Sequence, residues 1–309
     1  MAETFQTLLA RYQRDMELHN YSQRTVGDLS YTFKIFERFL GERRITDIER
    51  VTTAVLSDFQ HWLFYQPVKT GGSRGAASQN RTLGAIKSFF KFLVREGYLP
   101  RNPAAALEYA REPERLPRNV LTPQEAKKII EAIDISTALG YRDRTIMEVF
   151  YATGIRRTEL LALTVADVNL EEELLRVNKG KGGKDRVVPL SGVACKFLET
   201  YIKGVRPEWA RKRGSDRLFL SWRGRPLDAN TLRLLVNAHA QRARIKKHVT
   251  PHVWRHTCAT HLLKNNANLR HVQSILGHTL LSTTERYLHL TITDLKEAHR
   301  KFHPRERSQ

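Results

Sequence analysis

The sequence predicts a mostly α-helical protein of two domains, the second of which also contains a small antiparallel β-sheet. Three observations predict this. Apolar residues recur at helical spacing along the first third of the 309-residue chain. A charged segment that contains prolines and shows no periodicity follows. Further on, two short apolar runs flank a glycine-rich turn. We therefore expect a helical N-terminal domain over residues 1–111, a linker over 112–120 and a mixed domain over 121–309.

Four apolar stripes predict the helices of the first domain. They begin near Phe5, after a capping Ser22, near Val55 and near Leu83, and Gly97 is a typical stop after the last of them. Aromatic residues recur in all four stripes. At these spacings we expect them to form the core of the domain and not a surface for stacking on bases.

The second domain begins with a strong helix start. Thr122 can cap the first turn, Pro123 suits the first helical position, and Glu125 stands where a capping box places its acidic residue. The isoleucines of 129–133 and the apolar residues of 146–150 continue the helical pattern.

A β-hairpin and a further helical stretch follow. Residues 174–177 and 186–190 resemble short strands, and the glycines of 180–183 supply the turn between them. From Pro251 onward the pattern is helical again and is broken at Gly277.

The charge balance indicates a polyanionic partner. The chain holds 52 Lys and Arg against 32 Asp and Glu, a formal net charge of +20. Much of the excess lies in residues 203–247, which contain 13 basic and 3 acidic side chains. We expect this stretch to follow the backbone of DNA.

The remaining composition favours a cytoplasmic protein that does not enter a membrane. The two cysteines, Cys195 and Cys258, form neither a disulfide framework nor a four-cysteine zinc site. The first residues lack the basic and apolar regions of a signal peptide. No run approaches the roughly 20 apolar residues of a membrane helix.

Two motifs that would imply a nucleotide or a metal are incomplete. The glycine–lysine cluster is not a phosphate-binding P-loop, because Asp185 follows Lys184 where Ser or Thr is required. His252 and His256 have the spacing of a zinc peptidase helix, but Val253 replaces the glutamate that would serve as base. We therefore expect no metal and no cofactor.

Six scattered residues together fit one chemistry, although each alone has an ordinary structural explanation. Arginines grip a planar oxyanion, histidines and lysine donate or move protons, and a tyrosine can form a covalent intermediate. Such a set makes a phosphoryl-transfer site that needs no metal. The candidates are Arg156, Lys181, His252, Arg255, His278 and Tyr287.

The chain resembles the lambda-integrase family of tyrosine recombinases, and within it the Xer-like members. The resemblance covers residues 121–303, while the first third is more loosely similar to the family's helical core-binding domain. It implies the family's two-domain fold, with a mixed α/β catalytic domain. The matching runs, in family order, are Tyr141–Arg144, Tyr151–Leu160, Gly180–Leu190, Thr250–Thr257, Leu276–Thr279 and Ser282–Tyr287.

The resemblance also implies a role for each candidate. Arg156 and Arg255 would hold the non-bridging oxygens of the scissile phosphate. His252 and His278 would support that cage, and His252 would also help to deprotonate the nucleophile.

Two further residues would carry the bond changes. Tyr287 would attack the phosphate and form a 3′-phosphotyrosyl link, and Lys181 would protonate the leaving 5′ oxygen. Because the link conserves the bond energy, neither ATP nor a metal is required. The implied enzyme is a site-specific DNA recombinase that acts in integration, excision or resolution.

The sequence departs from the family pattern at two places, neither of them a candidate position. Val253-Trp254 replaces commoner residues, and Arg157 stands where an apolar residue is frequent. The tail Leu295–Pro304 resembles the helix that docks on a neighbouring subunit in the family. This implies a homotetramer on two DNA sites, each an inverted repeat.

Two other functions stay open from the sequence alone. One is a type IB-like topoisomerase that uses the same cage and tyrosine as a monomer, and the other is a non-catalytic DNA-binding relative. The tail and the N-terminal domain argue against the topoisomerase. The six candidate residues argue against the non-catalytic relative. The sequence also leaves open whether a second recombinase or an accessory protein takes part.

Overall fold

The chain folds as two compact units, Met1–Glu114 and Arg115–Gln309, and the division between them falls inside the segment 112–120. The structure, a computed structural model, describes residues 3–67, 73–112, 120–178 and 185–277. Within these residues no helix is both long and apolar enough to cross a membrane. The fold class predicted from the sequence is confirmed: the protein is mostly helical with one small antiparallel sheet.

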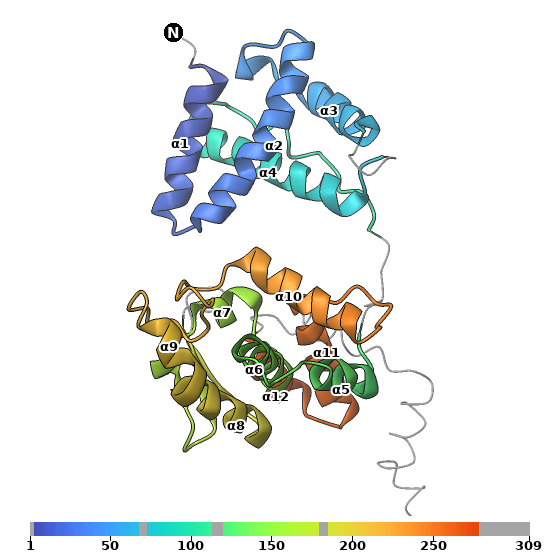
Figure 1. Cartoon of the computed structure of the whole chain (residues 1–309). Coiled ribbons are helices and arrows are strands. Elements are labelled where there is room, and N and C mark those ends of the chain that lie inside the picture. The colour runs from blue at the N-terminus through green and yellow to red at the C-terminus, as the bar shows by residue number, and fades with distance from the viewer. Residues whose placement is uncertain (1–2, 68–72, 113–119, 179–184, 278–309) are drawn as a thin grey trace, which may run out of the picture. The chain divides into compact units, whose positions relative to one another are not determined.

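The first unit is a bundle of helices around an aromatic core (Figure 1). The rings of Phe33, Phe36, Phe59 and Phe89 are fully buried and meet mostly edge to face, which confirms their predicted place in the core. The predicted cap is also confirmed, because the Ser22 hydroxyl accepts a hydrogen bond from the Thr25 backbone amide in the first turn of the helix. Its elements are α1 (Phe5–Leu18), α2 (Gln23–Glu42), the short 3-10 helix η1 (Ile48–Arg50), α3 (Thr53–Tyr65) and α4 (Ala76–Arg95).

The second unit packs its helices around the central helix α6, as Figure 1 shows. The predicted capping box at its start is present, with reciprocal hydrogen bonds between Thr122 and Glu125. Its helices are α5 (Pro123–Glu131), α6 (Ala138–Thr153), α7 (Arg157–Ala162), η2 (Val165–Asp167), α8 (Gly192–Thr200), the π-helical turn η3 (Tyr201–Val205), α9 (Arg206–Ala210), α10 (Ala229–Arg242), α11 (Pro251–Lys264) and α12 (Leu269–Leu276).

A three-stranded antiparallel sheet with the order β1-β2-β3 lies beside these helices. β2 (Leu174–Val177) and β3 (Arg186–Pro189) pair as the sequence predicts, with Leu175 opposite Val188. β1 (Val168–Asn169) was not predicted, because two residues are too few to show an alternating pattern. The turn expected at 180–183 lies outside the described residues.

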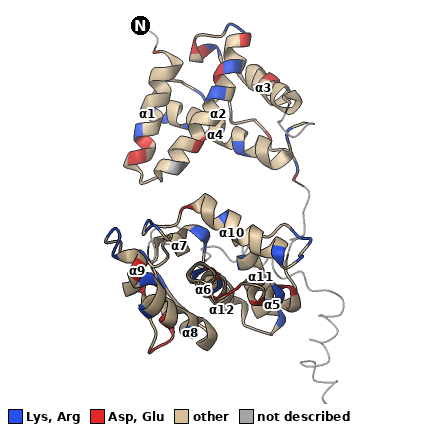
Figure 2. Cartoon of the chain, viewed as in Figure 1, with Lys and Arg blue, Asp and Glu red and all other residues tan. Residues whose placement is uncertain are grey.

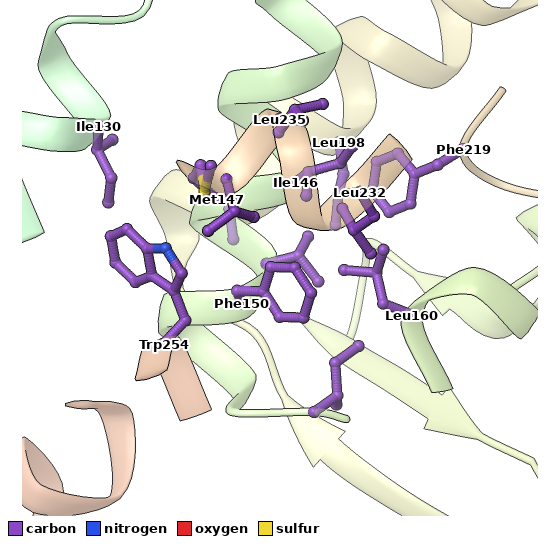
Figure 3. Close-up of a cluster of buried hydrophobic side chains, with 14 of the residues drawn as sticks. Ile130, Ile146, Met147, Phe150, Leu160, Leu198, Phe219, Leu232, Leu235 and Trp254 are labelled. Carbon is purple, nitrogen blue, oxygen red and sulfur yellow. The ribbon is translucent and has the colours of Figure 1, made fainter. Parts of the chain in front are cut away.

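The core of the second unit explains one departure from the family pattern. Trp254 of α11 is fully buried, and its ring lies 5.8 Å from that of Tyr151 in an edge-to-face contact. Figure 3 shows Trp254, Met147 and Phe150 among the buried side chains of this core. Trp254 is therefore a packing residue.

Gly154 makes the turn from α6 into α7, and the turn requires a glycine. Its φ of +58° is left-handed, and a Cβ built there would meet Leu276 Cδ2 at 2.9 Å and Cys258 Sγ at 3.2 Å. The turn is therefore constrained both by its backbone conformation and by the approach of α11 and α12. Because α7 begins at Arg157, this turn also sets the position of Arg156.

Replacing Gly154 by alanine should destabilise the protein more than the same change at Gly214. Gly214 has a similar φ of +64° but nothing within 4 Å of the added Cβ. We expect Gly214→Ala to cost about 1 kcal/mol from backbone strain, and Gly154→Ala about 2–4 kcal/mol because overpacking is added. Urea unfolding of the two variants tests this, and equal losses of stability would contradict it.

Candidate active site

Three arginine side chains converge on the C-terminal end of α12. They come from α11, from β3 and from the start of α7, and each holds one of the last three carbonyl groups before position 278. The hydrogen bonds run from Arg186 Nε to the Ile275 oxygen (3.0 Å), from Arg255 Nη2 to the Leu276 oxygen (2.7 Å) and from Arg156 Nη2 to the Gly277 oxygen (2.9 Å). The negative end of a helix dipole favours cations at this place.

The sequence around Arg156 and Arg255 explains why they meet. Gly154 ends α6 in a left-handed conformation, so the chain reverses and Arg156 stands at the N-cap of α7. Arg255 lies in the middle of α11, is almost fully buried, and also donates from Nη1 to the Gly154 oxygen at 2.8 Å. The Arg255 guanidinium group therefore holds both the turn at Gly154 and the end of α12.

Glu159 joins two of the arginines. Its Oε1 accepts from Arg156 Nη1 at 2.6 Å and from Arg186 Nη1 at 3.0 Å. Its Oε2 accepts from the Arg156 backbone amide at 2.8 Å and from Arg186 Nη2 at 2.7 Å. Both carboxylate oxygens are therefore fully engaged by arginine N–H groups.

The electrostatics of this cluster favour an anion. Burial alone would raise the pKa of the Glu159 carboxyl group, but the hydrogen bonds from Arg186 and Arg156 outweigh burial and lower it to about 2. Glu159 is therefore ionised at neutral pH. One carboxylate against three guanidinium groups leaves this hydrogen-bonded cluster with an excess of positive charge.

His252 lies one helical turn before Arg255 and contacts His256. The two Nε2 atoms are 2.8 Å apart, so at most one of them carries a proton. Burial and the Arg255 charge lower the pKa of His252. Burial, then the neighbouring His252 and Arg255, lower the pKa of His256 to about 4. Near neutral pH the pair is therefore uncharged and shares a proton.

The structure thus brings together three of the six predicted candidates: Arg156, Arg255 and His252. Lys181, His278 and Tyr287 lie outside the described residues, as does the tail Leu295–Pro304.

Cys258 and His261 of the same helix, which could in principle add metal ligands beside His252 and His256, have separate partners. Cys258 packs against Gly154, while His261 contacts the Tyr151 hydroxyl at 2.9 Å and the Leu121 carbonyl oxygen at 2.9 Å. In the described part of the chain, no group of three His, Cys, Asp or Glu is arranged to hold a metal ion.

Sequence reasoning missed two members of the cluster, Glu159 and Arg186. Glu159 stands three residues after the N-cap Arg156, which is the capping-box spacing and could have indicated it. Arg186 had no such signal, because its partners Glu159 and Ile275 lie 27 and 89 residues away in the sequence.

The basic stretch 203–247 contains both internally engaged and exposed side chains. Arg206 binds backbone carbonyls of residues 215–218, and Lys247 binds Glu125 and the Val120 carbonyl, so both are structural. Other basic residues are exposed, and Figure 2 shows Lys and Arg on the loops beside α9 and on α10. The exposed set includes Arg211, Lys212, Arg213, Arg223, Arg225, Arg233, Arg242 and Arg244.

Comparison with known proteins agrees with this architecture. Residues 119–293 match the model of the phage integrase family, and residues 9–97 match its N-terminal SAM-like domain. The tyrosine recombinase XerD of Staphylococcus haemolyticus is 36% identical over 301 residues, covering 97% of this chain and 99% of that protein. XerD of Staphylococcus aureus strain Mu50 is 35% identical with the same coverage.

Solved structures share the fold. XerA recombinase is 30% identical, covers 96% of this chain and 99% of its own, and superposes with a TM-score of 0.54. A lambda integrase fragment bound to a core site is 22% identical, covers 92% and 95% of the two chains and has a TM-score of 0.68. The chain therefore belongs to the phage integrase family, and it is a site-specific recombinase of the tyrosine class.

Acid should remove the stabilisation that Glu159 provides. Its folded-state pKa of about 2 lies below the ordinary value of 4.5, so the stabilisation is complete above pH 4.5 and is lost as the pH falls toward 2. The shift corresponds to about 3 kcal/mol, of which more than half should be gone at pH 3. The free-energy difference between wild type and Glu159→Gln, measured by urea unfolding, should therefore shrink from pH 7 to pH 3.

The exposed Glu171→Gln variant is the matched control, and its difference from wild type should stay small at both pH values. A Glu159→Gln difference that does not change with pH would show that the ion pairs of Glu159 contribute nothing to stability.

Proposed function

We propose that Arg156, Arg255 and the residues around them form a cage for the scissile phosphodiester of DNA. The observation that carries this proposal is the convergence of the two guanidinium groups at the end of α12, directly before His278. Toward the described residues, the Arg156 side chain uses two of its five N–H donors. Fixed donors aimed at a phosphate stabilise the charge that develops during its transfer.

Cleavage then follows from the remaining candidates. The Tyr287 oxygen attacks the phosphorus, the bond to the 5′ oxygen breaks, and a 3′-phosphotyrosyl link forms. Lys181 gives its proton to the leaving 5′ oxygen. The neutral His252–His256 pair supports a role for His252 in accepting the phenol proton, because an uncharged imidazole has a nitrogen lone pair for it. His278 completes the cage.

Rejoining reverses these steps with another strand. A 5′ hydroxyl from a partner DNA attacks the phosphotyrosyl link and releases Tyr287, so bond energy is conserved and no ATP is consumed. We propose a homotetramer on two inverted-repeat sites, linked through the tail Leu295–Pro304. The exposed basic residues near α9 and on α10 supply contacts to the phosphate backbone. The cytoplasm is the proposed place of action, since the substrate is cellular DNA.

Replacing Tyr287 by phenylalanine should abolish the covalent protein–DNA adduct while DNA binding is retained, because the attacking oxygen is lost. Adducts formed on DNA from the producing cells are trapped, and sequencing of the linked strand identifies the recombination site. Tyr65→Phe is the control, since Tyr65 is an exposed tyrosine at the end of α3. Adducts of normal yield with Tyr287→Phe would refute the assignment.

Lys181 and Lys184 should behave differently on DNA with a bridging sulfur. The 5′ alkoxide leaves poorly, so protonation by Lys181 should accelerate cleavage by about 10²–10⁴-fold. A 5′ thiolate leaves without protonation, since the pKa of a thiol is about 8.5. Lys181→Ala should therefore be slow on normal DNA and largely restored on the sulfur-substituted DNA.

Lys184→Ala is the control and should be mildly affected on both substrates. Rescue of Lys184→Ala but not of Lys181→Ala would identify Lys184 as the acid. Rescue of neither would exclude lysine as the general acid.

A further inference from the structure

Arg186 donates three hydrogen bonds within the cluster, although no step of the proposed chemistry uses it. It is the first residue of β3, and its side chain is 12% exposed. Two of its nitrogens bind the two oxygens of Glu159 as a fork, and Nε binds the Ile275 oxygen. One guanidinium group therefore ties β3 to α7 and to α12.

The same side chain also lies against the last described residue of the chain before His278. Gly277 has a φ of +63°, and a Cβ built there would lie 3.0 Å from Cδ, Nε and Cζ of Arg186. The left-handed turn that ends α12 is thus packed directly on the Arg186 guanidinium. Arg186 therefore leaves little room for a side chain at position 277.

Glu159 divides its carboxylate between Arg156 and Arg186. Arg156 now offers one side-chain nitrogen to Oε1, while Oε2 is occupied by the Arg156 amide and by Arg186. Without Arg186, the carboxylate would have no other guanidinium partner in the cluster. Arg156 would then rotate into a forked ion pair with Glu159, the geometry that arginine and carboxylate prefer.

We propose that Arg186 is a positioning residue of the recombination site: by sharing Glu159, it keeps the Arg156 guanidinium directed toward the phosphate, and it fixes the end of α12. The inference rests on the proposed function of Arg156. It assigns Arg186 no contact with DNA.

The test measures single-turnover cleavage of a nicked suicide duplex that carries the site recovered by adduct trapping. Arg186→Gln should cleave about 10²-fold more slowly than wild type, because misplacing a group that positions the phosphate has effects of this size. The Kd for the intact duplex should change less than about 3-fold, since Arg186 itself does not bind DNA. Unchanged cleavage by folded Arg186→Gln would overturn the proposal.

A second substitution separates positioning from mere stability. If Arg186 acts by sharing the charge of Glu159, then removing that charge should release Arg156. Arg186→Gln combined with Glu159→Gln should therefore cleave faster than Arg186→Gln alone. A double variant that is as slow as the single variant, or slower, would overturn the proposal.

Arg142→Gln is the matched control. Arg142 is also buried, binds the carboxylate of Asp143 through two nitrogens and binds the Leu220 carbonyl, but it is not hydrogen-bonded to the cluster at α12. Per folded molecule, it should cleave at the wild-type rate. A loss equal to that of Arg186→Gln would assign both to general destabilisation and overturn the proposal.

Two outcomes keep the inference decidable. If Arg186→Gln does not fold, Arg186→Lys replaces it. A single ammonium group does not reproduce the fork on both Glu159 oxygens and leaves one of them to Arg156, so this variant should also be slower than wild type with the same Kd. A wild-type rate would overturn the proposal. If wild-type protein forms no adduct on the suicide duplex, the proposed function fails, and the inference about Arg186 fails with it.

Discussion

The contact between three guanidinium groups and the carbonyls of Ile275, Leu276 and Gly277, at the end of α12, is the interaction on which the rest of the site depends. The buried residues of α12, Val272 and Leu276, form a small cluster with Ala259 of α11, and Ile275 packs on the main core of the unit. The arginines add polar contacts to this limited apolar packing. In return, the carbonyl end of the helix gives these cations a fixed, partly compensated environment.

Glu159 makes this concentration of positive charge compatible with folding. Arginines packed together repel one another, and one buried carboxylate shared between Arg156 and Arg186 offsets that repulsion. Because the compensation is incomplete, the cluster keeps an affinity for an anion. The ion pairs that stabilise the fold and the charge excess that suits a phosphodiester are thus parts of one arrangement.

Much of the fold could be predicted from the sequence, because its signals are local. The capping box at Thr122 and the strand Leu174–Val177 depend on residues close in sequence. The helices α7 to α10 were not predicted individually. Of these, α7, α8 and α9 have only 6, 9 and 5 residues and leave no long stripe. At the site, motif order indicated Arg156, His252 and Arg255, but not the carbonyls that hold the arginines. Those contacts join residues up to 121 positions apart, as between Arg156 and Gly277, and only the folded chain brings them together.

The cleavage rate of Arg156→Ala on DNA with a neutral methylphosphonate at the scissile position tests most directly whether the arginine cluster acts on the charge of a phosphodiester or only stabilises the fold. The account predicts a large defect relative to wild type on normal DNA and a much smaller defect on the neutral substrate, where no anionic oxygen requires the guanidinium group. Equal defects on both substrates would contradict it.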